Sequence, residues 1–119
     1  MKIDRNNRIN EEVKREVSDI IHSDLKDPRI GGMVSVIRAD VTGDLRYARI
    51  YVSIMAGDEE KKATMKALKS AAGFVRRELG ARIDLRYVPE IQFVLDTSIE
   101  YSIHINEVLK KVENDHKDV

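Results

Sequence analysis

RYARIYVSIM, residues 46–55, alternates small or aliphatic side chains with polar or aromatic ones. An alternation of period two indicates a strand with one buried face, because successive side chains point to opposite sides of a sheet. The even-numbered positions from Ala48 to Ile54 form the expected core face. Residues 33–41 before this stretch are rich in β-branched side chains, although they alternate imperfectly. Thr42-Gly43-Asp44 joins the two segments, and we expect Gly43 to accept a positive φ in an antiparallel hairpin.

Helical periodicity precedes the hairpin. Residues 9–25 place apolar side chains three or four positions apart, which predicts an amphipathic helix. Pro28 is expected to end this helix, because the residue before a proline is pushed out of helical geometry. The sequence around it, Asp27-Pro28-Arg29-Ile30-Gly31-Gly32, predicts a turn or loop.

A second helical segment follows the hairpin. Asp58 is its expected N-cap, with Glu59 and Glu60 in the first turn, where acidic side chains complement the helix dipole. Gly80 is expected to end the segment as a residue beyond the C-cap. Gly73 lies inside it, where glycine is about 1 kcal/mol less favourable than alanine. The motif Ala71-Ala72-Gly73 therefore predicts a kink or a close approach between helices.

Residues 83–96 contain a third expected strand, in which Ile91, Phe93 and Leu95 alternate with more polar neighbours and Pro89 stands at the start. Thr97-Ser98-Ile99-Glu100 has the spacing of a capping box that opens a last helix. These patterns predict one α+β domain over residues 1–112, with a small three-stranded sheet covered by helices on one face, and a polar, flexible tail at 113–119. The residues expected to be buried are Val13, Val17, Ile21, Ile50, Val52, Leu68, Ala71, Val75, Leu79 and Phe93.

Composition excludes several classes of function. The 119 residues include no cysteine, which excludes a disulfide framework, a thiolate metal site and a cysteine nucleophile. The three histidines lack metal-ligand spacing, so neither a metal nor a cofactor is expected. No apolar run approaches the about 20 residues of a membrane span, and the first residues lack the apolar core of a signal peptide. We therefore expect a cytoplasmic protein without membrane contact.

Positive charge is concentrated in one part of a chain whose net charge is +0. Residues 61–86 carry eight lysines and arginines against two acidic residues, whereas residues 87–119 carry three against seven. On a helical wheel, most of these cations fall opposite the apolar stripe, which suits contact with a phosphate backbone. The alternative is a solvated helix face. The candidate RNA-binding residues are Lys62, Lys66, Lys69, Gly73, Arg76, Arg77, Arg82 and Arg86.

Other candidate features are weaker. Tyr47, Arg49 and Tyr51 share the outer face of the hairpin and could stack on bases, but the face lacks the run of aromatics of a stacking platform, which favours an ordinary solvated sheet face. No glycine-rich phosphate loop, nucleophile elbow or metal-spaced cluster is present, and no nucleophile or general base stands out. We therefore do not expect an enzyme.

The order α-β-β-α-α-β resembles a type II KH domain, in which a GxxG loop between two helices clamps RNA backbone. At that position this chain has Ala71-Ala72-Gly73, which is similar to the Ala-x-Gly kink of the ribosome-binding factor A family. Three further segments match that family in order and spacing, from about Arg5 to Leu109: Leu25-Lys26-Asp27-Pro28-Arg29-Ile30, Arg86-Tyr87-Val88-Pro89-Glu90-Ile91-Gln92-Phe93 and Asp96-Thr97-Ser98-Ile99-Glu100.

The resemblance implies a function that composition alone does not give. The family binds the free small (30S) ribosomal subunit, assists late maturation and 5′-end processing of 16S rRNA, and supports growth in the cold in some bacteria. The missing GxxG implies recognition of the shape and charge of folded rRNA. No obvious coiled coil or large apolar surface in the sequence argues for a dimer, so we expect a monomer. The competing hypothesis is a protein–protein adaptor that uses the same helical face without contacting RNA.

Overall fold

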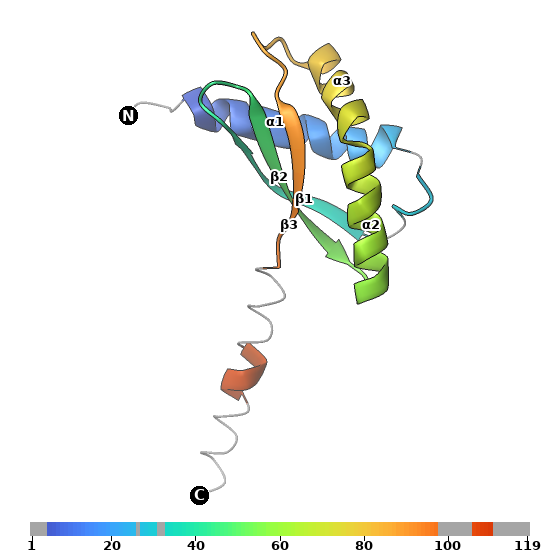
Figure 1. Cartoon of the computed structure of the whole chain (residues 1–119). Coiled ribbons are helices and arrows are strands. Elements are labelled where there is room, and N and C mark those ends of the chain that lie inside the picture. The colour runs from blue at the N-terminus through green and yellow to red at the C-terminus, as the bar shows by residue number, and fades with distance from the viewer. Residues whose placement is uncertain (1–4, 26, 31–32, 98–105, 111–119) are drawn as a thin grey trace, which may run out of the picture.

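The computed structural model describes residues 5–25, 27–30, 33–97 and 106–110. Its elements follow the predicted order, with a π-helical turn, η1, directly after the first helix. They are α1 (Arg5–Asp19), η1 (Ile20–Asp24), β1 (Met33–Val41), β2 (Tyr47–Met55), α2 (Asp58–Ser70), α3 (Ala72–Arg82) and β3 (Glu90–Leu95). Figure 1 shows the three strands beside α2 and α3, with α1 crossing them.

The sheet has the order β1-β2-β3, so β2 is its central strand. β1 and β2 form the predicted antiparallel hairpin, and β3 pairs with β2 in parallel, with Tyr47 opposite Glu90 and Val52 opposite Leu95. The ladder between β1 and β2 shifts register between Val36 and Arg38, which leaves Ile37 as one extra residue on β1. This β-bulge explains why the alternation of residues 33–41 is imperfect in the sequence.

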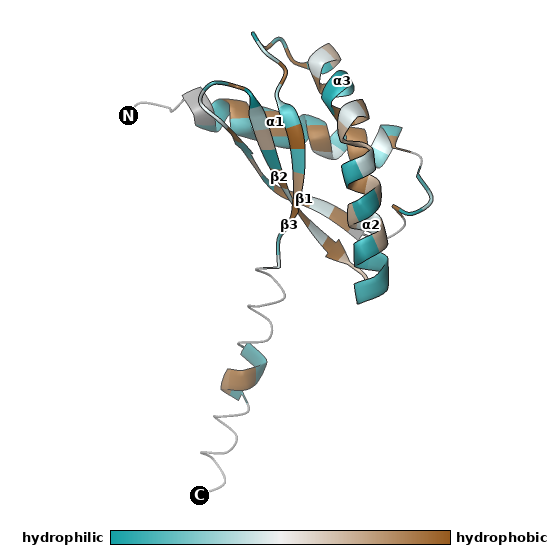
Figure 2. Cartoon of the chain, viewed as in Figure 1, coloured by the Kyte–Doolittle hydropathy of each residue, from teal (hydrophilic) through white to brown (hydrophobic). Residues whose placement is uncertain are grey.

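One face of the sheet is buried under the helices and the other is open. β2 alternates between buried and more exposed residues along its length, and the buried set is Ala48, Ile50, Val52 and Ile54, as predicted. Hydrophilic and hydrophobic segments alternate along α2 and α3, as expected for helices with one buried side (Figure 2). α1 packs on β1 and α3, while α2 and α3 pack on β3. The predicted α+β fold class is therefore confirmed.

The predicted core is confirmed at every expected position except Ala71, which is only partly buried. Ala71 lies at the bend between α2 and α3, with φ −87° and ψ −1°, so its side chain has left the stripe that Leu68 and Val75 share. The predicted kink is confirmed at this residue. The predicted close approach at Gly73 is wrong, because a Cβ added there would meet nothing within 4 Å.

Three local predictions need correction at element ends. The residue with a positive φ in the hairpin turn is Leu45, at 62°, and not Gly43; Leu45 packs against the core, which fixes its backbone. The N-cap of α2 is Gly57, so Asp58 is the first helical residue. Gly80 does not end α3, which continues to Arg82.

Gly80 is needed for packing. A Cβ at this position would lie 2.9 Å from Cγ2 of Val88, closer than real Cβ contacts, so the glycine lets α3 approach the segment that leads into β3. Pro89 follows Val88 and is buried immediately before β3 begins, as predicted.

Polar side chains fasten the helices to the connecting segments. Asn10 Oδ1 accepts a hydrogen bond of 2.9 Å from the backbone N–H of Val41 at the end of β1. Thr64, buried in α2, donates to the carbonyl oxygen of Arg29 at 3.1 Å and so holds the 27–30 loop against α2. His22 Nε2 lies 2.8 Å from the carbonyl oxygen of Val34, so this exposed histidine connects η1 to β1.

The C-terminal predictions fall largely outside the described residues. This holds for the capping box beyond Thr97 and for the expected tail at 113–119. Residues 106–110 are helical, and all five side chains are exposed. The domain limit at residue 112 and the relationship to KH domains stay predictions.

Candidate nucleic-acid interface

A hollow with a volume of about 750 Å³ lies along α2 beside the end of β3. All three predicted RNA-binding lysines line it, each about one helical turn from the next: Lys62, Lys66 and Lys69. Lys61 also lines the hollow, a residue that the helical wheel did not select. Lys61 lies four residues before Met65, which lines the same hollow, and this helical spacing could have identified it in the sequence. We call this hollow the lysine groove.

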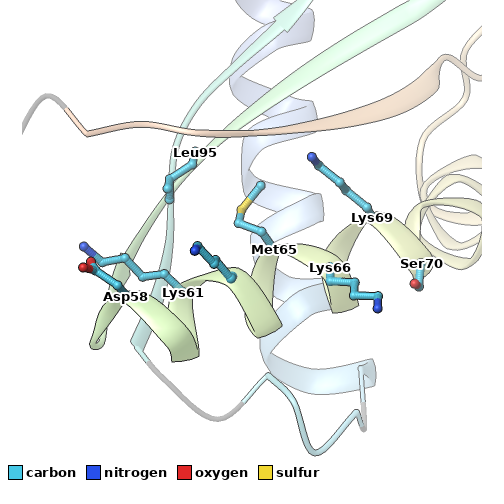
Figure 3. A pocket seen from close by; sticks show the side chains of 8 residues that line it. Asp58, Lys61, Met65, Lys66, Lys69, Ser70 and Leu95 are labelled. Atoms are coloured by element: carbon cyan, nitrogen blue, oxygen red, sulfur yellow. The ribbon is translucent and has the colours of Figure 1, made fainter.

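The floor of the lysine groove is apolar. Met65 of α2 and Leu95 of β3 point toward one another, and Lys69 extends toward the strand, as Figure 3 shows. Both apolar side chains are partly buried against the core. Lys62, Lys66 and Lys69 are exposed and have no hydrogen-bond or ion-pair partner among the described residues. Their ammonium groups are therefore available to a polyanion, because phosphate contact requires no internal pair to be broken.

Arg76 is used inside the protein. Its guanidinium donates through Nε and Nη2 to the carbonyl oxygen of Val88, at 3.3 and 3.1 Å. Val88 is also the residue that Gly80 approaches, so two neighbouring turns of α3 hold the same connecting segment. Arg76 lines a second hollow, near the hairpin turn, and not the lysine groove.

Arg82 joins the end of α3 to α1 and η1. Its guanidinium contacts three carboxylates: that of Asp19, that of Asp24 at 2.6 Å and that of Glu16 at 3.4 Å. The hydrogen bond to Asp19 is the main reason why the pKa of Arg82 is raised. The same hydrogen bond lowers the pKa of Asp19. An arginine that satisfies three carboxylates has few donors left for RNA.

The remaining candidates are exposed and are not gathered at one place. Arg77 has no hydrogen-bond or ion-pair partner in the described part of the chain. Arg86 lies 5.6 Å from the ring centroid of Tyr87 in a cation–π arrangement. Gly73 is exposed on α3 with open space around it. The structure therefore brings together the lysines of α2, whereas the arginines of α3 and the following segment lie in separate surroundings.

The outer face of the hairpin is open, as predicted. Tyr47 and Arg49 are exposed, and Tyr51 is partly covered by Arg38, whose guanidinium carbon lies 4.2 Å from the centre of its ring. Asp40 stands opposite Arg49 across the strands. The face thus mixes both signs of charge, which favours a solvated surface over a stacking platform.

Other chemistry finds little support in the described ranges. They contain no group of three or more His, Asp or Glu residues placed to hold a metal ion. In the same ranges, no helix combines the length and the apolar character required to cross a membrane. The most distinctive feature is therefore cationic: Lys62, Lys66 and Lys69, which have no partner among the described residues, lie in a row beside an apolar floor.

An α+β domain with a half-open sheet and a lysine-lined groove belongs to the class of small α+β binding domains. Its family is defined by a sequence profile described as ribosome-binding factor A, which matches residues 5–109. The chain belongs to this family.

Individual relatives agree with the profile. The ribosome-binding factor A of Clostridium novyi is 56% identical over 114 residues, which cover 92% of this chain and 94% of the relative. The crystal structure of ribosome-binding factor A from Thermus thermophilus has a TM-score of 0.67 at 22% identity and covers 76% of this chain and 94% of the other. A homology model of the Thermus factor, fitted into the cryo-EM map of a 30S complex, has a TM-score of 0.60 at 23% identity and covers 74% and 91%.

Proposed function

We propose that this protein binds the 30S ribosomal subunit through 16S rRNA and acts as a non-catalytic assembly factor in late subunit maturation, including processing of the 5′ end. The observation that carries the proposal is the lysine groove, whose three unpaired lysines lie on one exposed side of α2. Membership of the ribosome-binding factor A family supports it. The related Thermus factor, which was fitted into the map of a 30S complex, supports the choice of subunit.

The lysines act by neutralising phosphates, each of which releases a condensed counterion when it is bound. Lys66 and Lys69 supply the main contacts, with Lys62 at one end of the row and Arg77 beyond the bend. Met65 and Leu95 offer apolar surface to sugars or bases that enter the groove. Gly73 stays helical and the GxxG clamp is absent, so the protein recognises the shape and charge of folded rRNA.

A protein–protein adaptor that uses the same helices is the competing function. The apolar floor of the lysine groove is the observation that favours it. The two functions differ in their dependence on salt, because phosphate binding weakens steeply as salt rises, whereas apolar docking does not. We further propose that the protein acts as a monomer in the cytoplasm and supports growth in the cold.

Co-sedimentation with 30S subunits, 50S subunits and intact ribosomes tests the proposal. We expect the wild-type chain to sediment with free 30S subunits, and Lys66→Glu with Lys69→Glu to weaken this binding by at least tenfold. Losing two phosphate contacts should also flatten the slope of log affinity against log salt by about 1.4–1.8. Both lysines are exposed, so the change in stability should stay within about 0.5 kcal/mol.

The matched control reverses two lysines in the acidic C-terminal region, Lys110→Glu with Lys111→Glu. We expect these changes to leave 30S binding close to that of the wild type. If the folded Lys66/Lys69 variant binds 30S subunits as tightly as the wild type, the lysine groove is not the rRNA site. Binding that does not respond to salt supports the adaptor instead.

A further inference from the structure

A second hollow, of about 480 Å³, lies at the other end of β3, where three segments meet. They are the hairpin turn, α3 and the segment leading into β3, and we call the site the tyrosine hollow. The residues that matter for its chemistry are Asp44, Arg46, Tyr47, Arg76, Tyr87 and Glu90. Its size falls within the range of small-molecule sites, about 300–1,000 Å³.

The tyrosine hollow contains the two most exposed aromatic side chains among the residues that the structure describes, Tyr47 and Tyr87. The whole sequence has four tyrosines, two phenylalanines and no tryptophan. Tyr47 and Tyr87 are 43% and 57% exposed, although tyrosine rings are usually more deeply packed. Two such rings in one hollow form a surface suited to stacking with a flat aromatic ligand.

The walls of the hollow are held in place by the backbone. The N–H of Glu90 donates to the carbonyl oxygen of Arg46 at 2.8 Å, which fixes the turn against the start of β3. The N–H of Tyr47 donates to Oγ1 of Thr42 at 3.1 Å, and the N–H of Thr42 donates to the carbonyl oxygen of Tyr47 at 2.9 Å. The backbone of these walls therefore needs little ordering when a ligand binds, which favours affinity.

The charged groups around the rings match a nucleotide. Arg86 stands 5.6 Å from the centre of the Tyr87 ring. Arg46 pairs with Asp44, with 3.7 Å between Nε and Oδ2, but its side chain is 76% exposed and its other nitrogens can still reach a phosphate. Asp44 and Glu90 supply carboxylate oxygens that accept hydrogen bonds from the amino group of adenine or cytosine, which uracil lacks. Oδ1 of Asp44 accepts from the hydroxyl of Thr42 at 2.7 Å and from the backbone N–H of Arg46 at 3.1 Å, and these bonds lower the pKa of the carboxyl group and hold it in place.

We propose that the tyrosine hollow binds an unpaired, amino-bearing nucleobase of RNA, stacked on Tyr47 and Tyr87 with its phosphate beside Arg46 and Arg86. The inference rests on the proposed function, because it assigns a second contact to the same rRNA partner. The lysine groove would hold backbone and the tyrosine hollow would hold one base. The two sites lie at opposite ends of β3, about 17 Å apart along a strand of six residues.

Titration of the isotope-labelled full chain with AMP, followed by NMR, tests the site without a ribosome. We expect the ring signals of Tyr47 and Tyr87 to shift and saturate, while those of Tyr51 stay in place. UMP should shift them less. Tyr87→Phe should bind AMP nearly as the wild type does, because the stacking ring remains. Tyr87→Ala should bind AMP at least fivefold more weakly. Stacking contributes about 1–3 kcal/mol per base, and the lower end of this range corresponds to about fivefold in affinity.

Co-sedimentation with 30S subunits provides the second arm, with Tyr47→Ala and Tyr87→Ala combined. We expect weaker binding at every salt concentration with an unchanged salt slope, since no phosphate contact is removed. The site is refuted if AMP leaves both rings unshifted, or if the double variant binds 30S subunits as the wild type does. A response to a proline-rich peptide but not to AMP also refutes it, in favour of a protein partner. If the wild-type chain does not bind 30S subunits, the proposed function is refuted. The AMP titration still tests the tyrosine hollow in that case.

Discussion

α2 and α3 carry the same sign of charge in one continuous stretch of sequence, but the structure uses the two sets differently. Lys66 and Lys69 of α2 lie exposed along a groove without a partner in the described residues. Arg76 and Arg82 of α3 instead donate to a backbone carbonyl and to three carboxylates of the same chain. A guanidinium presents a planar fork of donors that suits such internal pairing, whereas a lysine ammonium is compact and strongly hydrated. Net charge along a sequence therefore overstates the surface that is available to RNA.

Replacing Arg82 is the strongest test of this difference between the arginines of α3 and the lysines of α2. We expect Arg82→Met to cause the largest loss of stability among substitutions of these cations, because Glu16, Asp19 and Asp24 are left close together without their shared partner. Arg82→Lys should recover only part of the loss, since one ammonium cannot reproduce the fork. Urea denaturation measures both variants, with Lys66→Met as a control that should unfold like the wild type. Equal midpoints for Arg82→Met and the wild type would contradict the structural role.

The difference in stability between the wild type and Arg82→Met should also depend on pH. The hydrogen bond from Arg82 lowers the pKa of Asp19 below its ordinary value of 3.8. A carboxyl group with a lowered pKa stabilises the folded state above its unfolded pKa, and this contribution is lost as the pH falls through the folded value. The stability gap between wild type and Arg82→Met should therefore be full at neutral pH and should close below about pH 4. A gap that widens on acidification would exclude this ion-pair account.

The two glycines of α3 provide a smaller test. Gly80→Ala places a methyl group 2.9 Å from Val88, a β-branched side chain that cannot easily move away. Overpacking should outweigh the gain in helix propensity, for a net loss of about 1 kcal/mol. Thermal denaturation of Gly80→Ala, of Val88→Ala and of the double variant gives the coupling between the two sites. Additive effects would mean that the two residues do not meet.

Gly73→Ala should have the smallest effect, and in the opposite direction. Gly73 is helical, its φ is not positive and nothing lies within 4 Å of the position that a Cβ would take. Alanine should therefore stabilise the protein by about 0.5–1 kcal/mol. Thermal denaturation measures the change, and a loss of stability would mean that a neighbour is present. If the stabilised variant binds 30S subunits more weakly, RNA approaches the backbone at Gly73.

Most of the fold could be predicted because it depends on local periodicity. The alternation of residues 46–55 identified β2 and its buried side, and Pro89 marked the start of β3. The parallel pairing of β3 with β2 was not predicted. The sequence pattern of a strand does not identify the strand with which it pairs across the α2–α3 crossover. The prediction that Gly43 has the positive φ in the turn was wrong for a related reason. The packing of the Leu45 side chain, a tertiary contact, outweighs the conformational freedom of Gly43.

The candidate site was predictable in part. Helical spacing correctly grouped Lys62, Lys66 and Lys69, because residues on one helix keep their relation to each other. It failed to separate them from Arg76 and Arg82, whose partners lie 12 and up to 66 positions away in the sequence. Nor could it show that Tyr47 and Tyr87 line one hollow, because their shared position depends on the β2–β3 pairing.

The bulge at Ile37 bears on how this sheet avoids aggregation. β1 is an edge strand of nine residues, and a long regular edge exposes unpaired N–H and C=O groups on which a strand of another molecule can assemble. The extra residue interrupts the even spacing of these groups near the middle of the strand. Arg38 follows it directly, Asp40 lies two residues beyond Arg38, and both are exposed. A foreign strand would therefore meet an uneven, charged edge, so the irregularity that blurred the sequence pattern also protects the protein from edge-to-edge association.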